Sequence, residues 1–181
     1  MKLTNTSNQL DLFQTLYQTP RAEPLHKRDL VPINNLKVIF REIRDYFAGN
    51  VTGITRDETI AENMMRLLFC KVLDERGKQN DEILEIARRP NESAHDLYDR
   101  VTRVFGLVKA RFPDIFTLDE TIEIPPADLA WIVGNIESYS LFQTDRDVIA
   151  DAFEELIGRS FRGGEGQFFT PRNVVQMMVE V

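Results

Sequence analysis

The stretch Leu67-Leu-Phe-Cys-Lys-Val-Leu-Asp-Glu75 decides how this chain folds. It is apolar on nearly every face of a helix, a pattern that is typical of a helix buried at the centre of a core. Upstream, Thr55-Arg-Asp-Glu58 has the form of a capping box, with a threonine N-cap and a glutamate three residues later. Gly77 is a natural C-terminal stop. The sequence therefore predicts a central helix that runs from this capping box to Gly77.

Amphipathic helices are predicted on both sides of the central helix. Apolar residues recur in each of them at intervals of three and four, which gives the helix one face toward the core. Gly49, Pro113 and Gly158 supply stops, and Pro126 supplies a first helical residue. The predicted helices cover residues 34–47, 93–112, 126–139 and 144–157.

The connections between these helices carry weaker signals. Residues 78–92 are mostly polar and predict at most a short turn of helix at 81–88. The alternation of Ile122 and Ile124 with polar residues allows one short extended piece before the next helix. Neither connection changes the helical character of the chain.

These patterns together predict an all-α fold, a helical bundle of about five helices. No run of strands separates the helices, which argues against a mixed architecture. A glycine-rich loop, Gly163-Gly-Glu-Gly166, and the start of a sixth helix follow the bundle. We expect an N-terminal arm interrupted by prolines (1–33), a helical domain (34–157), and a linker with the start of another domain (158–181).

Composition excludes several classes of protein. A content of 43% hydrophobic and 28% charged residues is typical of a globular protein, and a net charge of −7 argues against a surface made wholly for nucleic acid. The single cysteine, Cys70, excludes an internal disulfide, indicates a reducing compartment and suits a buried thiol. No apolar run approaches the roughly 20 residues of a membrane span, and no signal peptide is recognisable. We therefore expect no membrane association and a cytoplasmic location.

Charge is unevenly distributed along the chain. Residues 114–157 carry eleven acids and one base, which makes a net charge of −10. Such a span faces either solvent or a basic partner protein, and it is unsuited to a DNA backbone. In the arm, Arg21 and His26-Lys-Arg28 form a small basic spot, for which a solvated loop is the simpler interpretation.

Most patterns that carry catalysis are missing. His26 and His95 have no partner at ligand spacing, so no metal site is predicted, and no serine stands in a nucleophile elbow. Asp74-Glu75 and Glu154-Glu155 are adjacent acids, but neighbours in sequence point to different faces of a helix. We expect ionic or capping roles for these carboxylates rather than paired acid–base work.

The last sixteen residues, Gly166-Gln-Phe-Phe-Thr-Pro-Arg-Asn-Val-Val-Gln-Met-Met-Val-Glu-Val181, contain the most informative motif. Thr170 suits an N-cap and Pro171 a first helical position, so a helix is predicted to start here. The free N–H groups and positive dipole of such a helix end suit a carboxylate or phosphate. The alternative is a purely structural staple in which Phe169 packs on Val174. The preceding glycine loop lacks the Gly-Lys-Ser/Thr ending of a phosphate-binding P-loop.

Residues 166–179 resemble the motif that precedes the S-adenosylmethionine fold in adenine-N6 DNA methylases, most closely the modification subunits of type I restriction-modification systems. Residues 67–75 and 147–157 are similar to segments of the N-terminal helical domain of that subunit. The resemblance covers roughly residues 35–181.

The resemblance implies a cofactor and a reaction for the intact protein. Six residues would border the methionine end of S-adenosylmethionine, with Thr170 nearest its carboxylate. The intact protein would transfer a methyl group to adenine N6 in DNA, together with a specificity subunit and a restriction subunit. The family's Gly-x-Gly cofactor motif and its catalytic Asn-Pro-Pro-Tyr/Phe do not occur in these 181 residues, so no residue is assigned as catalytic. We expect a truncated, inactive fragment whose helical domain helps to enclose DNA and assemble subunits. The six cofactor-binding candidates are Gln167, Phe168, Phe169, Thr170, Pro171 and Arg172.

Two other functions compete with this one. The chain could be a self-contained helical adaptor that binds a protein partner through the acidic surface of residues 114–157. Non-specific DNA binding by the helical domain alone is disfavoured by the net charge of −7.

Overall fold

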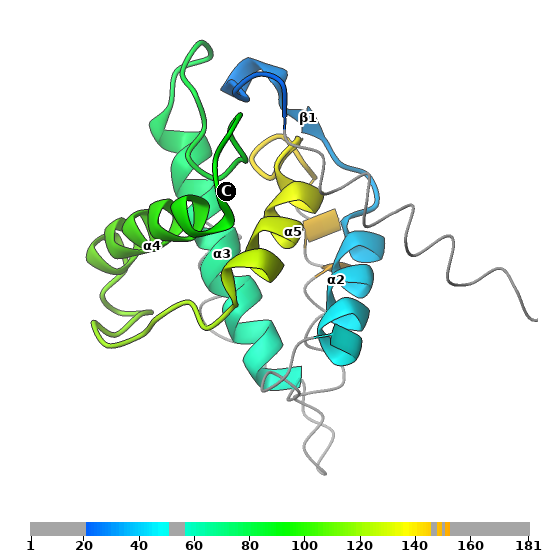
Figure 1. The fold of residues 1–181 in the computed structure, drawn as a ribbon, viewed down its shortest axis with the longest axis vertical. Coiled ribbons are helices and arrows are strands. Elements are labelled where there is room, and N and C mark those ends of the chain that lie inside the picture. Colours follow the sequence, from blue (N-terminus) through cyan, green and yellow to red (C-terminus); the bar gives the residue numbers. More distant parts are fainter. Residues whose placement is uncertain (1–20, 51–56, 146–147, 150, 153–181) are drawn as a thin grey trace, which may run out of the picture.

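A computed structural model describes residues 21–50, 57–145, 148–149 and 151–152 of the chain. Within these residues the fold is mostly helical, as the sequence predicts, and Figure 1 shows four α-helices beside one short strand pair. Strands β1 (Val31–Pro32) and β2 (Tyr139–Ser140) pair in parallel, and a 3-10 helix, η1, precedes them. The helices are α2 (Leu36–Asn50), α3 (Asp57–Gly77), α4 (Ala94–Arg111) and α5 (Pro126–Ile136), and η1 covers Lys27–Asp29.

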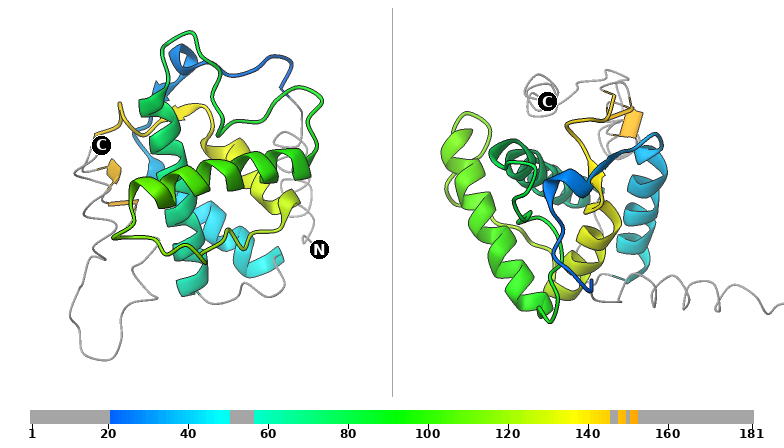
Figure 2. Two further views of the ribbon diagram at one scale, coloured as in Figure 1. Left: turned by 90° about the vertical axis from the view of Figure 1, so that its left-hand side faces the viewer. Right: turned by 90° about the horizontal axis from the view of Figure 1, so that it is seen from above.

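Helix α3 is the centre of the described fold, which confirms the prediction made from residues 67–75. Every residue from Asn63 to Val72 is buried. Helix α3 packs against α2 and α4, and α5 packs against the same two helices. Figure 2 shows α4 lying across α3. Because neighbours surround this stretch of α3, its polar side chains, Asn63, Arg66 and Lys71, meet protein rather than water.

Helix α4 begins and ends within one residue of the predicted range 93–112. The Ser93 hydroxyl accepts a hydrogen bond from the Asp96 N–H at 3.2 Å, and the Asp96 carboxylate accepts one from the Ser93 N–H at 3.1 Å. This reciprocal capping box satisfies two backbone donors at the helix start. At the other end, edge-to-face aromatic contacts join α4 to α3 and to the chain that follows. The rings in contact are Phe69 with Phe112, Phe69 with Phe116, and Phe105 with Phe116.

An aromatic stack joins α2 to α5. The rings of Tyr46 and Trp131 lie parallel with centroids 4.0 Å apart, and the Tyr46 hydroxyl donates to Asp128 at 2.7 Å. Burial and the bond to Asp128 raise the pKa of Tyr46 well above its usual range. A stack of this kind fixes how the two helices face each other.

The predicted helical turn at 81–88 is wrong, because this segment contains no helix. Its backbone N–H groups bond to other parts of the molecule instead of to one another. The Leu84 N–H donates to the Leu25 carbonyl at 2.9 Å, and the N–H groups of Glu85 and Ile86 donate to the Asp74 carboxylate. Tertiary partners replace the helical ladder.

Helix α5 is shorter than predicted, because Tyr139 belongs to strand β2. Beyond Ile136 the carbonyl groups have partners from distant segments. The Glu137 carbonyl accepts from the Lys71 ammonium at 3.4 Å, and the Ser138 carbonyl accepts from the Val31 N–H at 3.1 Å. Because of these partners the backbone is extended after Ile136, which the local sequence pattern did not predict.

The predicted end of α2 and the predicted extended piece at Ile122 and Ile124 differ in part from the structure. Helix α2 continues to Asn50, so Gly49 does not end it. Ile122 and Ile124 are both buried, as alternation predicts, but they form no strand. The Glu123 N–H between them donates to the Asn63 side chain at 2.8 Å instead.

Parts of two predicted helices lie outside the described residues. These parts include Thr55 of the predicted capping box and most of 144–157, in which Val148, Ile149, Asp151 and Ala152 are described and are helical.

The described part of the N-terminal arm lies on the helical body, as predicted. Leu25 and Leu30 pack with Leu84 and Ala87 in a small cluster beside the main core. The basic spot of the arm is held by the body: Lys27 donates to the Lys78 carbonyl at 2.8 Å, Arg28 pairs with Asp81, and Arg21 pairs with Glu137. None of the helices in the described ranges combines the length and apolarity that crossing a membrane requires.

Candidate functional site

The cofactor-binding residues predicted from the sequence, Gln167, Phe168, Phe169, Thr170, Pro171 and Arg172, lie outside the residues that the structure describes. Their role stays a prediction. The polar groups that the structure does bring together belong to α3 and to the segments that surround it.

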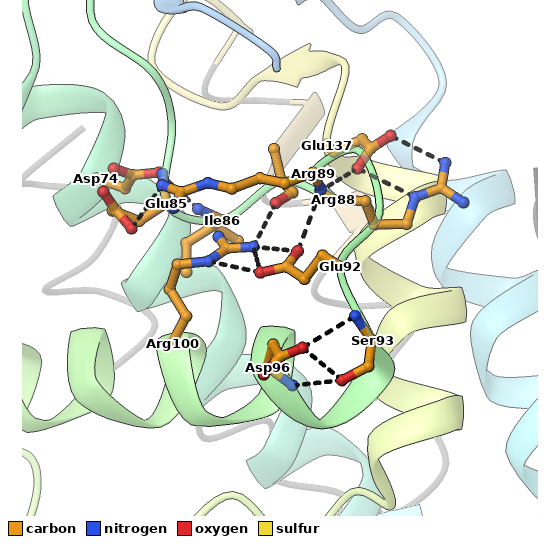
Figure 3. Close-up of polar contacts among 11 residues, drawn as sticks. Asp74, Glu85, Ile86, Arg88, Arg89, Glu92, Ser93, Asp96, Arg100 and Glu137 are labelled. Carbon is orange, nitrogen blue, oxygen red and sulfur yellow. Dashed lines mark hydrogen bonds and ion pairs between the residues drawn. The ribbon is translucent and has the colours of Figure 1, made fainter. Parts of the chain in front are cut away.

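Asp74 holds the segment that follows α3. One oxygen of its carboxylate accepts hydrogen bonds from the backbone N–H groups of Glu85 at 2.7 Å and Ile86 at 2.8 Å, as Figure 3 shows. The other oxygen is buried and has no hydrogen-bond partner among the described residues. Burial raises the pKa of Asp74, and the two backbone donors and the nearby Lys78 charge oppose that shift only in part.

Glu75 points to a different side of α3 and holds a different segment. Its carboxylate accepts from the Ser140 hydroxyl at 2.8 Å and from the N–H groups of Leu141 and Phe142 at 3.1 and 3.2 Å. The Lys71 ammonium lies 3.1 Å from it, and both side chains are 1% exposed. The prediction that these two adjacent acids serve ionic or capping roles on separate faces is confirmed.

A third buried carboxylate, Glu137, lies directly after α5 and joins the N-terminal arm to the segment that follows α3. The Arg88 guanidinium donates to it through Nε and Nη2 at 3.2 and 2.9 Å, and the Arg88 N–H adds a bond of 2.8 Å. Arg21 of the arm donates to it as well, at 3.2 Å. The Arg88 guanidinium passes close to Gly134, where an added Cβ would lie 2.7 Å from Cζ. A glycine at this position of α5 therefore leaves room for the arginine.

Arg100 joins α4 to the chain between α3 and α4. Its guanidinium donates to the Glu92 carboxylate at 2.6 Å and to the Ala87 carbonyl at 2.9 Å (Figure 3). The side chain is 3% exposed, and its Nη1 has no hydrogen-bond partner within the described ranges. Its positive charge is thus already neutralised inside the protein.

A groove opens between the C-terminal end of α3, helix α4 and the chain that follows α3. We call it the α3–α4 groove. It encloses ≈ 650 Å³, within the range of ligand pockets, about 300–1,000 Å³. One wall is α4, with three arginines and two apolar residues, and the other wall carries three acids, a lysine, Leu73 and Gly77. The lining residues are Leu73, Asp74, Gly77, Lys78, Glu82, Glu85, Arg100, Arg103, Val104, Leu107 and Arg111.

Other reactive side chains of the described fold offer less to a ligand. Cys70 is fully buried, and burial raises the pKa of its thiol well above the usual range, which disfavours the reactive thiolate. Within the described ranges, no three His, Cys, Asp or Glu side chains gather in a way that could hold a metal ion.

Sequence reasoning missed this groove, although a signal was present. Arg103, Leu107 and Arg111 follow one another at four-residue intervals, which places them on one face of α4. Whether these residues line a groove depends on where α3 ends and on the path of the segment that follows it. The spacing of residues in α4 predicts neither.

No protein-family model matches this chain, and no curated protein matches it.

Proposed function

We propose that this chain is the N-terminal helical part of a type I modification subunit, a DNA methylase that acts on adenine N6. The observation that carries the proposal is the sequence Gly-Gln-Phe-Phe-Thr-Pro-Arg of residues 166–172, with its resemblance to the segment that precedes the cofactor fold of that family. The mostly helical fold of the described residues is compatible with it. S-adenosylmethionine is the cofactor that the proposal requires.

The proposed roles follow the chemistry of a helix start. The Thr170 hydroxyl and the N–H groups that follow Pro171 would bind the carboxylate of S-adenosylmethionine. Phe168 and Phe169 would cover its apolar and cationic parts, since aromatic faces attract a sulfonium cation. DNA, a specificity subunit and a restriction subunit are the proposed partners, and the cytoplasm is the proposed location.

The decisive experiment uses the complete reading frame that contains these codons, expressed with its specificity subunit. Transfer of labelled methyl groups from S-adenosylmethionine to adenine in DNA is the expected result. Thr170→Val removes the cap, so it should raise KM for the cofactor by about tenfold, as loss of a hydrogen bond to a charged group predicts. Thr102→Val, at an exposed position of α4, is the matched control and should change nothing.

Two results would contradict the proposal. The first is a complete protein that transfers no methyl group to any adenine, with or without its specificity subunit. The second is an equal KM for the cofactor in the Thr170→Val and Thr102→Val variants. The 181 residues alone are expected to be inactive, because they contain no Asn-Pro-Pro motif.

The adaptor alternative draws less support from the contacts of its acidic span. Several of the acids in 114–157 are used inside the fold: Glu120 pairs with Arg66 at 3.1 Å, Glu137 with Arg88 at 2.9 Å, and Asp128 accepts from Tyr46. Acids that are already paired contribute little to a docking surface. Binding of a basic partner that is lost on neutralising the exposed Asp114 and Asp119 would favour the adaptor instead.

A further inference from the structure

The outer wall of the α3–α4 groove is an exposed stripe of α4. Arg103, Leu107 and Arg111 stand at four-residue intervals along it, and all three are exposed. Leu107 is 64% exposed, an unusual position for a leucine flanked by two arginines on a helix face. An apolar side chain between two cations forms a short amphipathic recognition surface.

The groove continues beyond this stripe toward the aromatic cluster. A second hollow of ≈ 260 Å³ shares Leu73, Gly77 and Arg111 with the first, and Phe69 and Phe112 lie at its end. The two hollows therefore form one track over the crossing of α3 and α4 that is visible in Figure 2. Two adjoining hollows beside an exposed helix face suit an extended or helical peptide.

The cations of the groove differ in how far they are already paired. Arg100 is bound to Glu92, and Lys78 lies 3.5 Å from Glu85. In the part of the chain that the structure describes, Arg103 and Arg111 form no ion pair, and Arg111 lies over the Phe112 ring at 5.7 Å. These two arginines are the charges that a partner can use.

We propose that the α3–α4 groove binds an acidic amphipathic helix of a partner protein. An apolar residue of that helix would cover Leu107, and its flanking carboxylates would pair with Arg103 and Arg111. Glu82 and Glu85 on the facing wall repel any anion, so the carboxylates of the partner helix must lie against Arg103 and Arg111. Nucleic acid fits less well, because its phosphates are not confined to one face and because a phosphate backbone leaves Leu107 uncovered. The proposal does not depend on the methylase function.

The test uses the full 181-residue chain, labelled with nitrogen-15. The probe is an amidated helical peptide of about 18 residues made of leucine, alanine and glutamate, with leucines at intervals of three and four. Its addition should shift the backbone amide signals of residues 73–78 and 103–111. Arg103→Gln and Arg111→Gln should each weaken binding about threefold, and Leu107→Ala should weaken it at least as much.

Matched controls separate local pairing from overall charge. Thr102→Glu changes the net charge by the same amount as Arg103→Gln, but Thr102 is not part of the groove lining, so its effect should be smaller. A second peptide with lysine in place of glutamate should bind more weakly by at least about tenfold. All variants replace exposed side chains and should keep the wild-type circular dichroism spectrum.

Several outcomes would overturn the proposal. No amide shifts at about 1 mM acidic peptide would show that the groove does not bind such a helix. Equal affinity for the two peptides, or equal affinity of Arg103→Gln and wild type, would remove the role of charge. A DNA duplex that shifts the same amides while the acidic peptide does not would assign the groove to nucleic acid. A dimer that Arg103→Gln dissociates would assign it to a second copy of this chain.

Discussion

Asp74 and Glu75 are neighbours in α3, but their carboxylates lie on two sides of the helix and have different surroundings. Glu75 is sealed against Lys71 and bound to the segment after β2. Asp74 holds two backbone N–H groups with one oxygen, lines an open groove, and leaves its other oxygen without a partner among the described residues. The Glu75 side, which we call the sealed side, stabilises the fold. On the Asp74 side, which we call the open side, Arg103 and Arg111 form no ion pair among the described residues, and it is there that we propose a partner binds.

The largest effect is expected on the sealed side. Glu75→Leu leaves the Lys71 ammonium buried without a carboxylate, and it should lower the free energy of unfolding by about 3–5 kcal/mol. Lys71→Met should cost less, because the Glu75 carboxylate keeps its three other donors, one from Ser140 of β2 and two from the residues that follow β2. Urea denaturation of both variants measures the difference. Equal losses would mean that the three donors do not matter.

A smaller loss is expected on the open side. Asp74→Ala removes the acceptor of two backbone N–H groups, but water can reach them from the groove, so the cost should be about 1–3 kcal/mol. Asp74→Asn keeps an acceptor oxygen and removes the buried charge, so it should stay within about 1 kcal/mol of wild type. The same urea experiment applies, and an asparagine variant as unstable as the alanine variant would contradict this account.

Gly134→Ala tests the arginine that binds Glu137. The added methyl group would lie 2.7 Å from Arg88 Cζ, so the guanidinium must move away from the carboxylate. A helical alanine gains about 1 kcal/mol over glycine, and the lost charged bonds should outweigh that gain by about 1 kcal/mol. Gly106→Ala in α4, where a Cβ meets nothing within 4 Å, is the control and should raise the thermal midpoint. A stabilised Gly134→Ala variant would show that Arg88 moves at no cost.

The pH dependence of stability should also distinguish the two sides. Burial raises the pKa of Asp74, so the folded protein holds this proton more tightly than the unfolded chain does. The contribution of Asp74 is therefore most favourable in acid and is lost as pH rises from about 4, the ordinary aspartate value, through the raised value. Denaturation at several pH values should show this fall in wild type and its absence in Asp74→Asn. A pH profile shared by both proteins would rule out the raised pKa.

The smallest effect is expected at the rim of the groove. Arg103→Gln and Leu107→Ala remove exposed side chains and should change the free energy of unfolding by less than about 0.5 kcal/mol. Thermal denaturation followed by circular dichroism measures this. A large loss of unfolding free energy would mean that these residues stabilise the fold, as Glu75 does on the sealed side.

The polar residues of α3 show how far sequence reasoning extends. The run from Leu67 to Glu75 predicts a buried helix because its apolar residues surround the helix axis. Helical geometry also separates Asp74 from Glu75. The partner segments of those carboxylates cannot be predicted in this way, because Glu85 and Leu141 reach α3 only through the course of the intervening chain.

In the segments between helices, sequence reasoning failed where it had succeeded for α3. Residues 81–88 suggest a helical turn by composition, and Tyr139 fits the apolar spacing of the preceding helix. In the structure the backbone of 81–88 bonds to Leu25 and Asp74, while Tyr139 pairs with Val31 in a parallel strand. Backbone groups in short segments follow whichever partner satisfies them, and here those partners are distant in sequence.

The sequence by itself determined the helical class, the central place of α3, the end of α4 before Pro113 and the separate faces of Asp74 and Glu75. These features depend on local periodicity and on helix ends, which a few neighbouring residues specify. Only the tertiary structure decided the strand pair, the paths of the connections and the α3–α4 groove. Each of these brings together residues that are far apart in the chain, and their positions depend on how whole helices pack.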